Sequence, residues 1–94
     1  MIRSYGDRRS QRFAAGERVP AFEGFRHQAE KRLRILEAAA NLRDLAQLRS
    51  NRLEALAGDR EGQYSIRINQ QWRICFELTQ GADGPENVEI ADYH

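Results

Sequence analysis

The sequence predicts a single α+β domain in which helices cover one face of an antiparallel sheet. Two patterns support this prediction. Apolar residues recur every three or four positions between Pro20 and Ala40, as in an amphipathic helix, and at every second position after Gly62, as in half-buried strands. A length of 94 residues is enough for one hydrophobic core. We therefore expect residues 1–94 to form one domain built from two layers.

The N-terminal residues carry the weakest structural signals. Ile2–Tyr5 alternate between apolar and polar side chains and are expected to form a short first strand, ended by a Gly-Asp pair. Residues 6–19 are polar and rich in arginine around Phe13. We expect a short helix there, followed by a loop at Gly16. This segment is also expected to be the most mobile part of the domain.

The segment from Pro20 to Ala40 is predicted to be a helix with one apolar stripe. Proline suits its first turn, because that turn lacks partners for its backbone N–H groups. The opposite face is charged, so we interpret His27 on that face as a surface histidine and not as a ligand. The apolar stripe consists of Phe22, Phe25, Ala29, Leu33, Leu36 and Ala40.

The segment that follows is marked by leucines at Leu42, Leu45, Leu48, Leu53 and Leu56. The first three are spaced for a further helix, which the Ser-Asn pair at 50–51 interrupts. We expect the last two to anchor an irregular loop on the core, and loops of this kind commonly carry functional residues.

Alternation after Gly62 predicts a three-stranded antiparallel meander. Apolar and polar side chains alternate from Tyr64 to Ile68 and from Trp72 to Leu78, which leaves only residues 69–71 to turn the chain. The sequence GADGPEN is predicted to form a second turn, and Val88–Tyr93 is expected to be the last strand.

The same alternation assigns the side chains of the meander to two faces. The face packed on the helix is predicted to contain Tyr64, Ile66, Ile68, Trp72, Ile74, Phe76, Leu78, Val88 and Ile90. The opposite, partly open face is predicted to carry Arg67, Arg73, Cys75, Glu77, Glu89 and Tyr93. Its two arginines are expected either to pair with the two glutamates across the strands or to bind a phosphate. Cys75 is interpreted as a small spacer. Asp92 and His94 follow the parity of Ile90, toward the helical layer.

Composition limits the classes of function. The chain is 40% hydrophobic and 31% charged, which is typical of a globular protein, and no apolar run is long enough to span a membrane. The start lacks a signal segment and Cys75 is the only cysteine, so we expect a cytoplasmic protein without an internal disulfide.

The basic residues are nearly all arginines. Lys31 is the only lysine among 15 basic residues, which suits contact with RNA but equally fits a genomic preference for arginine codons. A net charge of +1 argues against nonspecific binding along a polyanion and favours a partner met at one local site. The chain has no zinc or calcium spacing and no glycine-rich phosphate loop, so we expect neither a metal nor a cofactor.

The C-terminal half resembles one family of bacterial proteins. The stretch NRLEALAGDREGQYSIRINQQWRICFELT, with the final VEIADYH, is similar to HigB-type toxins of toxin-antitoxin systems, within the RelE/ParE superfamily, and MIRSY resembles their start. The resemblance implies a RelE-like fold and a ribosome-dependent ribonuclease that cuts messenger RNA in the vacant decoding site. It also implies a helix-turn-helix antitoxin, similar to HigA, that binds the toxin and represses their operon at operator DNA.

The resemblance also implies the site residues. Arg73, Asp92, Tyr93 and His94 match the catalytic motif, and Arg67 lies beside it as an RNA contact. Cleavage through the 2′-hydroxyl of RNA needs a base, an acid and stabilisation of charge on the phosphate, and it needs no metal. Arg73 suits the phosphate, His94 is an acid or a base, Asp92 is a base or orients the imidazole, and Tyr93 stacks on a base or holds the phosphate. The acid and the base remain unassigned.

The chain departs from its relatives in the loop before GDREG. Many of them carry a histidine or a lysine there, whereas this chain has Glu54 and Ala57. Glu54 either replaces a proton acceptor next to the RNA or is a surface carboxylate. Two other functions are therefore kept open. One is a ParE-like toxin that binds DNA gyrase and lacks ribonuclease chemistry, and the other is a weakened toxin that serves as a binding module for the antitoxin or the operator.

Overall fold

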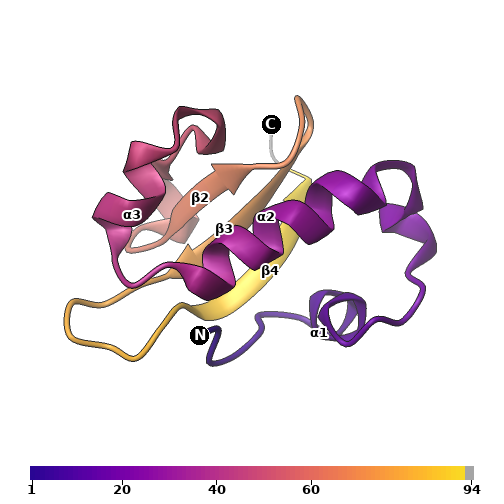
Figure 1. The fold of residues 1–94 in the computed structure, drawn as a ribbon, viewed down its shortest axis with the longest axis horizontal. Helices are drawn as coiled ribbons and strands as arrows, with labels where there is room; N and C mark the ends of the chain where they lie inside the picture. The colour runs from indigo at the N-terminus through magenta and orange to yellow at the C-terminus, as the bar shows by residue number, and fades with distance from the viewer. Residues whose placement is uncertain (93–94) are drawn as a thin grey trace.

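Helices cover one face of a four-stranded antiparallel sheet with the strand order β1-β2-β3-β4 in the computed structural model, which describes residues 1–92 (Figure 1). The predicted α+β class is therefore confirmed. No helix among these residues is both long and apolar enough to cross a membrane. The helices are α1 (Arg8–Ala14), α2 (Arg26–Ala38) and α3 (Leu42–Gln47), with 3-10 turns at Pro20–Phe25, Arg49–Asn51 and Gly58–Arg60. The strands are β1 (Glu54–Ala55), β2 (Tyr64–Arg67), β3 (Trp72–Glu77) and β4 (Glu86–Asp92).

The main core lies between α2 and the face of the sheet that alternation predicts. Each fully buried apolar side chain contributes about 1.5–3 kcal/mol before the loss of conformational entropy is counted. Trp72 closes one end of this core, with ring centroids 5.6 Å from Phe22 and 5.0 Å from Phe25. The apolar side chains with no exposed surface include Phe22, Leu36, Ile66, Ile74, Phe76, Val88 and Ile90.

The predicted helix from Pro20 to Ala40 is shorter and is divided in two. Its first turn is a 3-10 helix that ends at Phe25, where the backbone leaves helical geometry (φ −134°, ψ 29°) before α2 begins. This break lets both Phe22 and Phe25 reach the core. At the other end Ala39 is extended and buried while Ala40 is exposed, so the last member of the predicted stripe is wrong.

The predicted first strand is reduced to one parallel bridge between Tyr5 and Val88 in β4. Two backbone hydrogen bonds flank it, from Gly6 to the Val88 carbonyl (2.8 Å) and from Val88 to the Ser4 carbonyl (3.0 Å). Regular pairing does not continue, because Asn87 adopts a left-handed conformation (φ 53°) at this point of β4. The N-terminal segment nevertheless covers the outer edge of the sheet.

The short helix predicted between residues 6 and 19 is confirmed as α1. The Asp7 side chain caps it by accepting from the amide of Ser10, and the chain turns at Gly16 (φ 92°). The hydroxyl of Ser10 is buried and accepts a hydrogen bond from the amide of Ile90 at 2.8 Å. Helix α1 thereby satisfies an edge N–H group of β4 that no further strand reaches.

The loop after α3 contains the strand β1, which the sequence did not predict. Glu54 pairs with Ser65 of β2, and Ala55 pairs with Tyr64. The two leucine anchors are confirmed, and they act on different faces. Leu53 packs against the main core, whereas Leu56 covers the opposite face of the sheet. That face is consequently less open than predicted, because Leu56 forms a small buried cluster there with Cys75 and Ala91.

Candidate functional site

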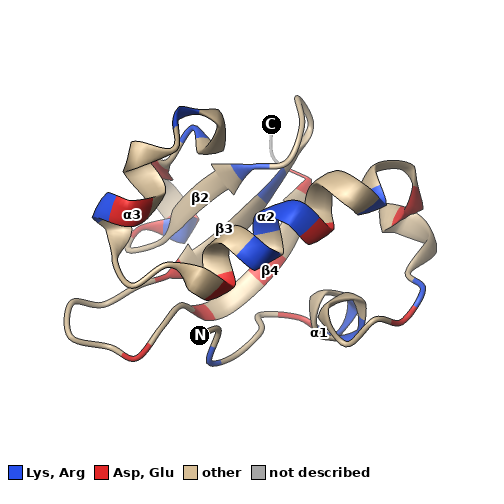
Figure 2. Ribbon diagram, in the orientation of Figure 1, with Lys and Arg blue, Asp and Glu red and all other residues tan. Residues whose placement is uncertain are grey.

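Two arginines face each other across the sheet, on the side away from α2. Arg67 at the end of β2 is the register partner of Arg73 near the start of β3. Figure 2 shows basic positions at these two strand ends, close to the end of β4. Within residues 1–92, neither guanidinium makes an ion pair with a carboxylate. Two adjacent cations repel each other, so the pair is well suited to an anion.

The predicted cross-strand pairs with glutamate are wrong, and the register of β4 explains why. The position opposite Arg73 on β4 is Ala91, which carries no charge. Glu89 lies opposite Cys75 and pairs with Arg60 at 3.3 Å. Glu77 accepts a hydrogen bond from a side-chain amide on β4 at 3.0 Å. Both carboxylates are therefore engaged away from the arginine pair.

The guanidinium of Arg73 is held by two uncharged acceptors. Its Nε donates to the hydroxyl oxygen of Ser65 at 2.7 Å, and its Nη2 donates to the carbonyl oxygen of Arg52 at 2.6 Å. Arg67 is held less extensively, through a hydrogen bond from its Nε to the carbonyl of Asn69 at 3.1 Å. Sequence reasoning missed Ser65, although the alternation that places Arg67 and Arg73 on this face places Ser65 there too.

The Arg52 carbonyl projects from an unusual turn. Arg52 follows the 3-10 turn Arg49–Asn51 and has a left-handed backbone (φ 45°, ψ 53°), which is costly for a residue with a side chain. Asn51 fixes this turn from within the protein, because its side chain is fully buried. Its Oδ1 accepts from Arg32 at 2.7 Å, and its Nδ2 donates to the carbonyl of Leu45 at 3.0 Å. No sequence pattern signals this anchor.

Glu54 lies on the same face as Arg73. It is the register partner of Ser65, whose hydroxyl receives the Arg73 hydrogen bond, and its side chain is exposed. Among the predicted site residues with described positions, Glu54, Arg67 and Arg73 therefore share one face of the sheet.

Asp92 occupies the same end of the sheet but the other face. It is opposite Trp72, one position from the Arg73–Ala91 pair, so the parity predicted for it is confirmed. Its carboxylate accepts a hydrogen bond from Gln71 at 3.0 Å. The predicted catalytic residues Tyr93 and His94 lie outside the described residues.

Cys75 lies two positions from Arg73 on the same face of β3 and is fully buried. Burial is the main cause that raises the pKa of its thiol, and the charge of Glu89 raises it further. The charges of Arg60 and Arg73 lower this pKa in part. The direction favours the protonated thiol, which is a poor nucleophile. This environment supports the interpretation of Cys75 as a spacer in the sheet.

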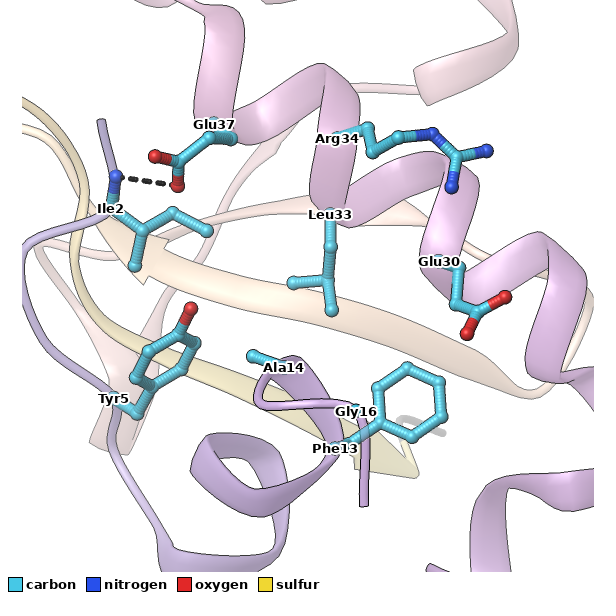
Figure 3. Close-up of a pocket in the computed structure, with 9 residues that line it drawn as sticks. All are labelled: Ile2, Tyr5, Phe13, Ala14, Gly16, Glu30, Leu33, Arg34 and Glu37. Carbon is cyan, nitrogen blue, oxygen red and sulfur yellow. Dashed lines mark hydrogen bonds between the residues drawn. The ribbon is translucent and has the colours of Figure 1, made fainter. Parts of the chain in front are cut away.

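A cavity of about 410 Å³ lies on the other side of the sheet, between the N-terminal segment, α1 and α2 (Figure 3). The backbone N–H of Ile2 donates to Glu37 at its rim, at 2.9 Å. Burial and then the charge of Glu37 raise the pKa of Tyr5, whose ring lines the cavity. None of the predicted site residues that lie within residues 1–92 lines this cavity. Within residues 1–92, no cluster of three or more His, Cys, Asp or Glu side chains is arranged to hold a metal ion.

The amino-acid sequence matches a family of known proteins. Residues 11–94 match the family model described as the RelE-like toxin of the type II toxin-antitoxin system HigB. The chain is 41% identical over 51 residues to the "Toxin HigB-1" of Vibrio cholerae, covering 54% of each protein. It is 36% identical over 63 residues to the "Endoribonuclease HigB" of Proteus vulgaris, covering 67% of this chain and 65% of that protein. The matched part thus spans between half and two thirds of these relatives.

Proposed function

The chain belongs to the HigB family of RelE-like toxins of type II toxin-antitoxin systems, and on this basis we propose that it is an endoribonuclease that cuts messenger RNA on the ribosome. The relative from Proteus vulgaris is named an endoribonuclease, which supports the reaction class. The observation that carries the proposal is the arginine pair, with Arg73 held at the end of the sheet by neutral acceptors.

Neutral acceptors matter because they orient a guanidinium without cancelling its charge. An ion pair with a carboxylate would compete with an incoming phosphate, and Arg73 makes no such pair within the described residues. Arginine binds phosphate oxygens through two parallel N–H groups, and such charge-assisted bonds are about twice as strong as neutral ones. Arg67 lies directly opposite and adds a second positive charge to the same face.

The remaining chemistry is acid–base catalysis at the phosphate. A base removes the proton of the 2′-hydroxyl, the 2′-oxygen attacks phosphorus, and an acid protonates the leaving 5′-oxygen, so that a cyclic phosphate and a 5′-hydroxyl are formed. We assign Glu54, which shares the face of Arg73, as the acceptor of the first proton. We assign the second transfer and the holding of the nucleotide to Asp92, which ends β4, and to Tyr93 and His94, which follow it in the sequence. Neither transfer requires a metal ion.

The low net charge suggests that the RNA substrate is held by another macromolecule while this protein cuts it. At +1, the chain has little nonspecific attraction for a long polyanion, so selective cutting needs the message to be held in place. We propose that the ribosome, with its decoding site vacant, holds it. The toxin would therefore act in the cytoplasm. We further propose that a helix-turn-helix antitoxin similar to HigA binds this chain and represses the shared operon at operator DNA.

A test compares the wild type with Arg73→Ala and with the matched control Arg43→Ala, whose exposed guanidinium lies on α3. Each chain is induced without antitoxin, and the 5′ ends of cellular messages are mapped. Loss of one stabilising donor typically lowers the rate about 100- to 1000-fold, so Arg73→Ala should abolish new ends while Arg43→Ala keeps them. Uncut messages with broken DNA would instead indicate a gyrase toxin, and unaffected growth would indicate a binding module.

A further inference from the structure

We propose that Ser65 is a positioning residue that presets the guanidinium of Arg73 for phosphate binding, with the Arg52 carbonyl as its second support. The inference rests on the proposed function, because the preset guanidinium is assigned to the scissile phosphate. It adds an uncharged residue that is not among those matching the catalytic motif.

The burial of Ser65 is the first support. The side chain has no exposed surface, and its hydroxyl oxygen accepts the Arg73 Nε hydrogen bond at 2.7 Å. A buried hydroxyl without a hydrogen bond is destabilising, so the hydrogen bond with Arg73 also stabilises the folded strand. Ser65 is paired with strands on both sides, through Glu54 of β1 and Cys75 of β3, and so cannot shift as a loop residue would.

The second support is which N–H groups of the Arg73 guanidinium are bound within the protein. The two described bonds engage Nε and Nη2, which leaves the N–H groups of Nη1 and the second one of Nη2 for a ligand. The Nη1 and Nη2 end of a guanidinium is one of the two edges through which arginine binds two oxygens of a phosphate. An arginine side chain has many rotamers, and fixing it before the substrate binds removes that reorganisation from the catalytic step.

The second anchor of Arg73 is also rigid. The Arg52 carbonyl comes from a left-handed residue, and the adjacent Asn51 is locked by hydrogen bonds to Arg32 and Leu45. The guanidinium of Arg73 is thus held from two places, by Ser65 of β2 and by the Arg52 carbonyl after the 3-10 turn. Removal of one support should loosen Arg73 without removing its charge.

The test is a double-mutant cycle of Ser65→Ala and Arg73→Ala in single-turnover cleavage of message on purified ribosomes. Ser65→Ala should lower the rate at saturation about 10- to 100-fold, as expected for a misplaced catalytic group, while half-saturation changes little. In the Arg73→Ala background the same change should have almost no effect, because Ser65 acts through that side chain. Ser65→Thr retains the hydroxyl on a strand-favouring residue and should recover most of the rate.

Nuclear magnetic resonance of the Arg73 Nε–H group tests positioning without cleavage. In the wild type this proton should exchange slowly with water, and Ser65→Ala should accelerate the exchange, whereas the exposed control Ser50→Ala should leave it unchanged. If the wild type leaves messages intact but protects this proton, the proposed ribonuclease function is refuted and the positioning of Arg73 by Ser65 is not. Equal protection in Ser65→Ala, or an equal loss of rate with and without Arg73, overturns the positioning role.

Discussion

Asn51→Ala should be among the most destabilising substitutions outside the main apolar core. The Asn51 side chain is fully buried and makes two hydrogen bonds, one from the guanidinium of Arg32 and one to the carbonyl of Leu45. Leu45 lies in the last turn of α3, where helical carbonyls lack partners within the helix. Asn51 therefore ends α3 and also shapes the turn that presents the Arg52 carbonyl to Arg73.

The magnitude follows from these two bonds. A hydrogen bond from a charged donor contributes about 1.5–3 kcal/mol and a neutral one about 0.5–1.5 kcal/mol. Arg32 is partly exposed and keeps a second acceptor in Ser50, so the loss should fall toward the lower end. We expect the free energy of unfolding to decrease by about 2–3 kcal/mol, which corresponds to roughly 10–20 °C in melting temperature for a domain of this size.

Urea denaturation followed by the fluorescence of Trp72 measures this change, and Ser50→Ala is the matched control. The Ser50 hydroxyl accepts from the same Arg32 nitrogen at 3.2 Å but is exposed, so its removal should cost less than about 0.5 kcal/mol. If Asn51→Ala were no more destabilising than Ser50→Ala, Asn51 would not be the anchor of the turn.

Two further predictions concern other parts of the sheet. Ser10→Ala should lower the free energy of unfolding by about 1–3 kcal/mol and increase hydrogen exchange at the Ile90 amide, whereas Ser4→Ala, whose hydroxyl accepts from an exposed amide, should have little effect. Burial raises the pKa of Cys75, so the unfolded chain loses this proton first and stability should fall as the pH rises past about 9. Cys75→Ala should flatten this alkaline decline in chemical denaturation, and an unchanged decline would show that the thiol is not its source.

Periodicity predicted the parts of the fold that repeat over many residues. The alternation from Tyr64 to Leu78 reports burial directly, because every second side chain of a half-buried strand meets the core. It therefore gave the correct face for the meander, including the position of Asp92. The charge pairs were wrong because parity defines a face but not a register. The pairing of β3 with β4 shifts in register between Cys75 and Glu77 of β3, at an irregularity that no local sequence pattern predicts.

The support of Arg73 could not be predicted because it is made of contacts between distant residues. The strand β1 contains two residues, too few for a period, and it forms only by pairing with β2. The left-handed conformation of Arg52 is disfavoured locally and is held by the burial of Asn51. The resemblance predicts Arg73 as a site residue, but a motif names the residue and not the groups that hold it.

The placement of Arg73 and Asp92 constrains how a substrate can lie. Their backbones occupy adjacent rows of the β3–β4 ladder, but their side chains leave on opposite faces. Within a sheet the backbone separates the two faces, so one phosphate can meet both groups only where the strands end. Arg67 ends β2, Arg73 lies at the second position of β3, and Asp92 ends β4, which places all three at that end. Under the proposed function, an RNA would therefore cross the end of the sheet, with Arg73 and Glu54 on one side of the phosphate and Asp92 on the other.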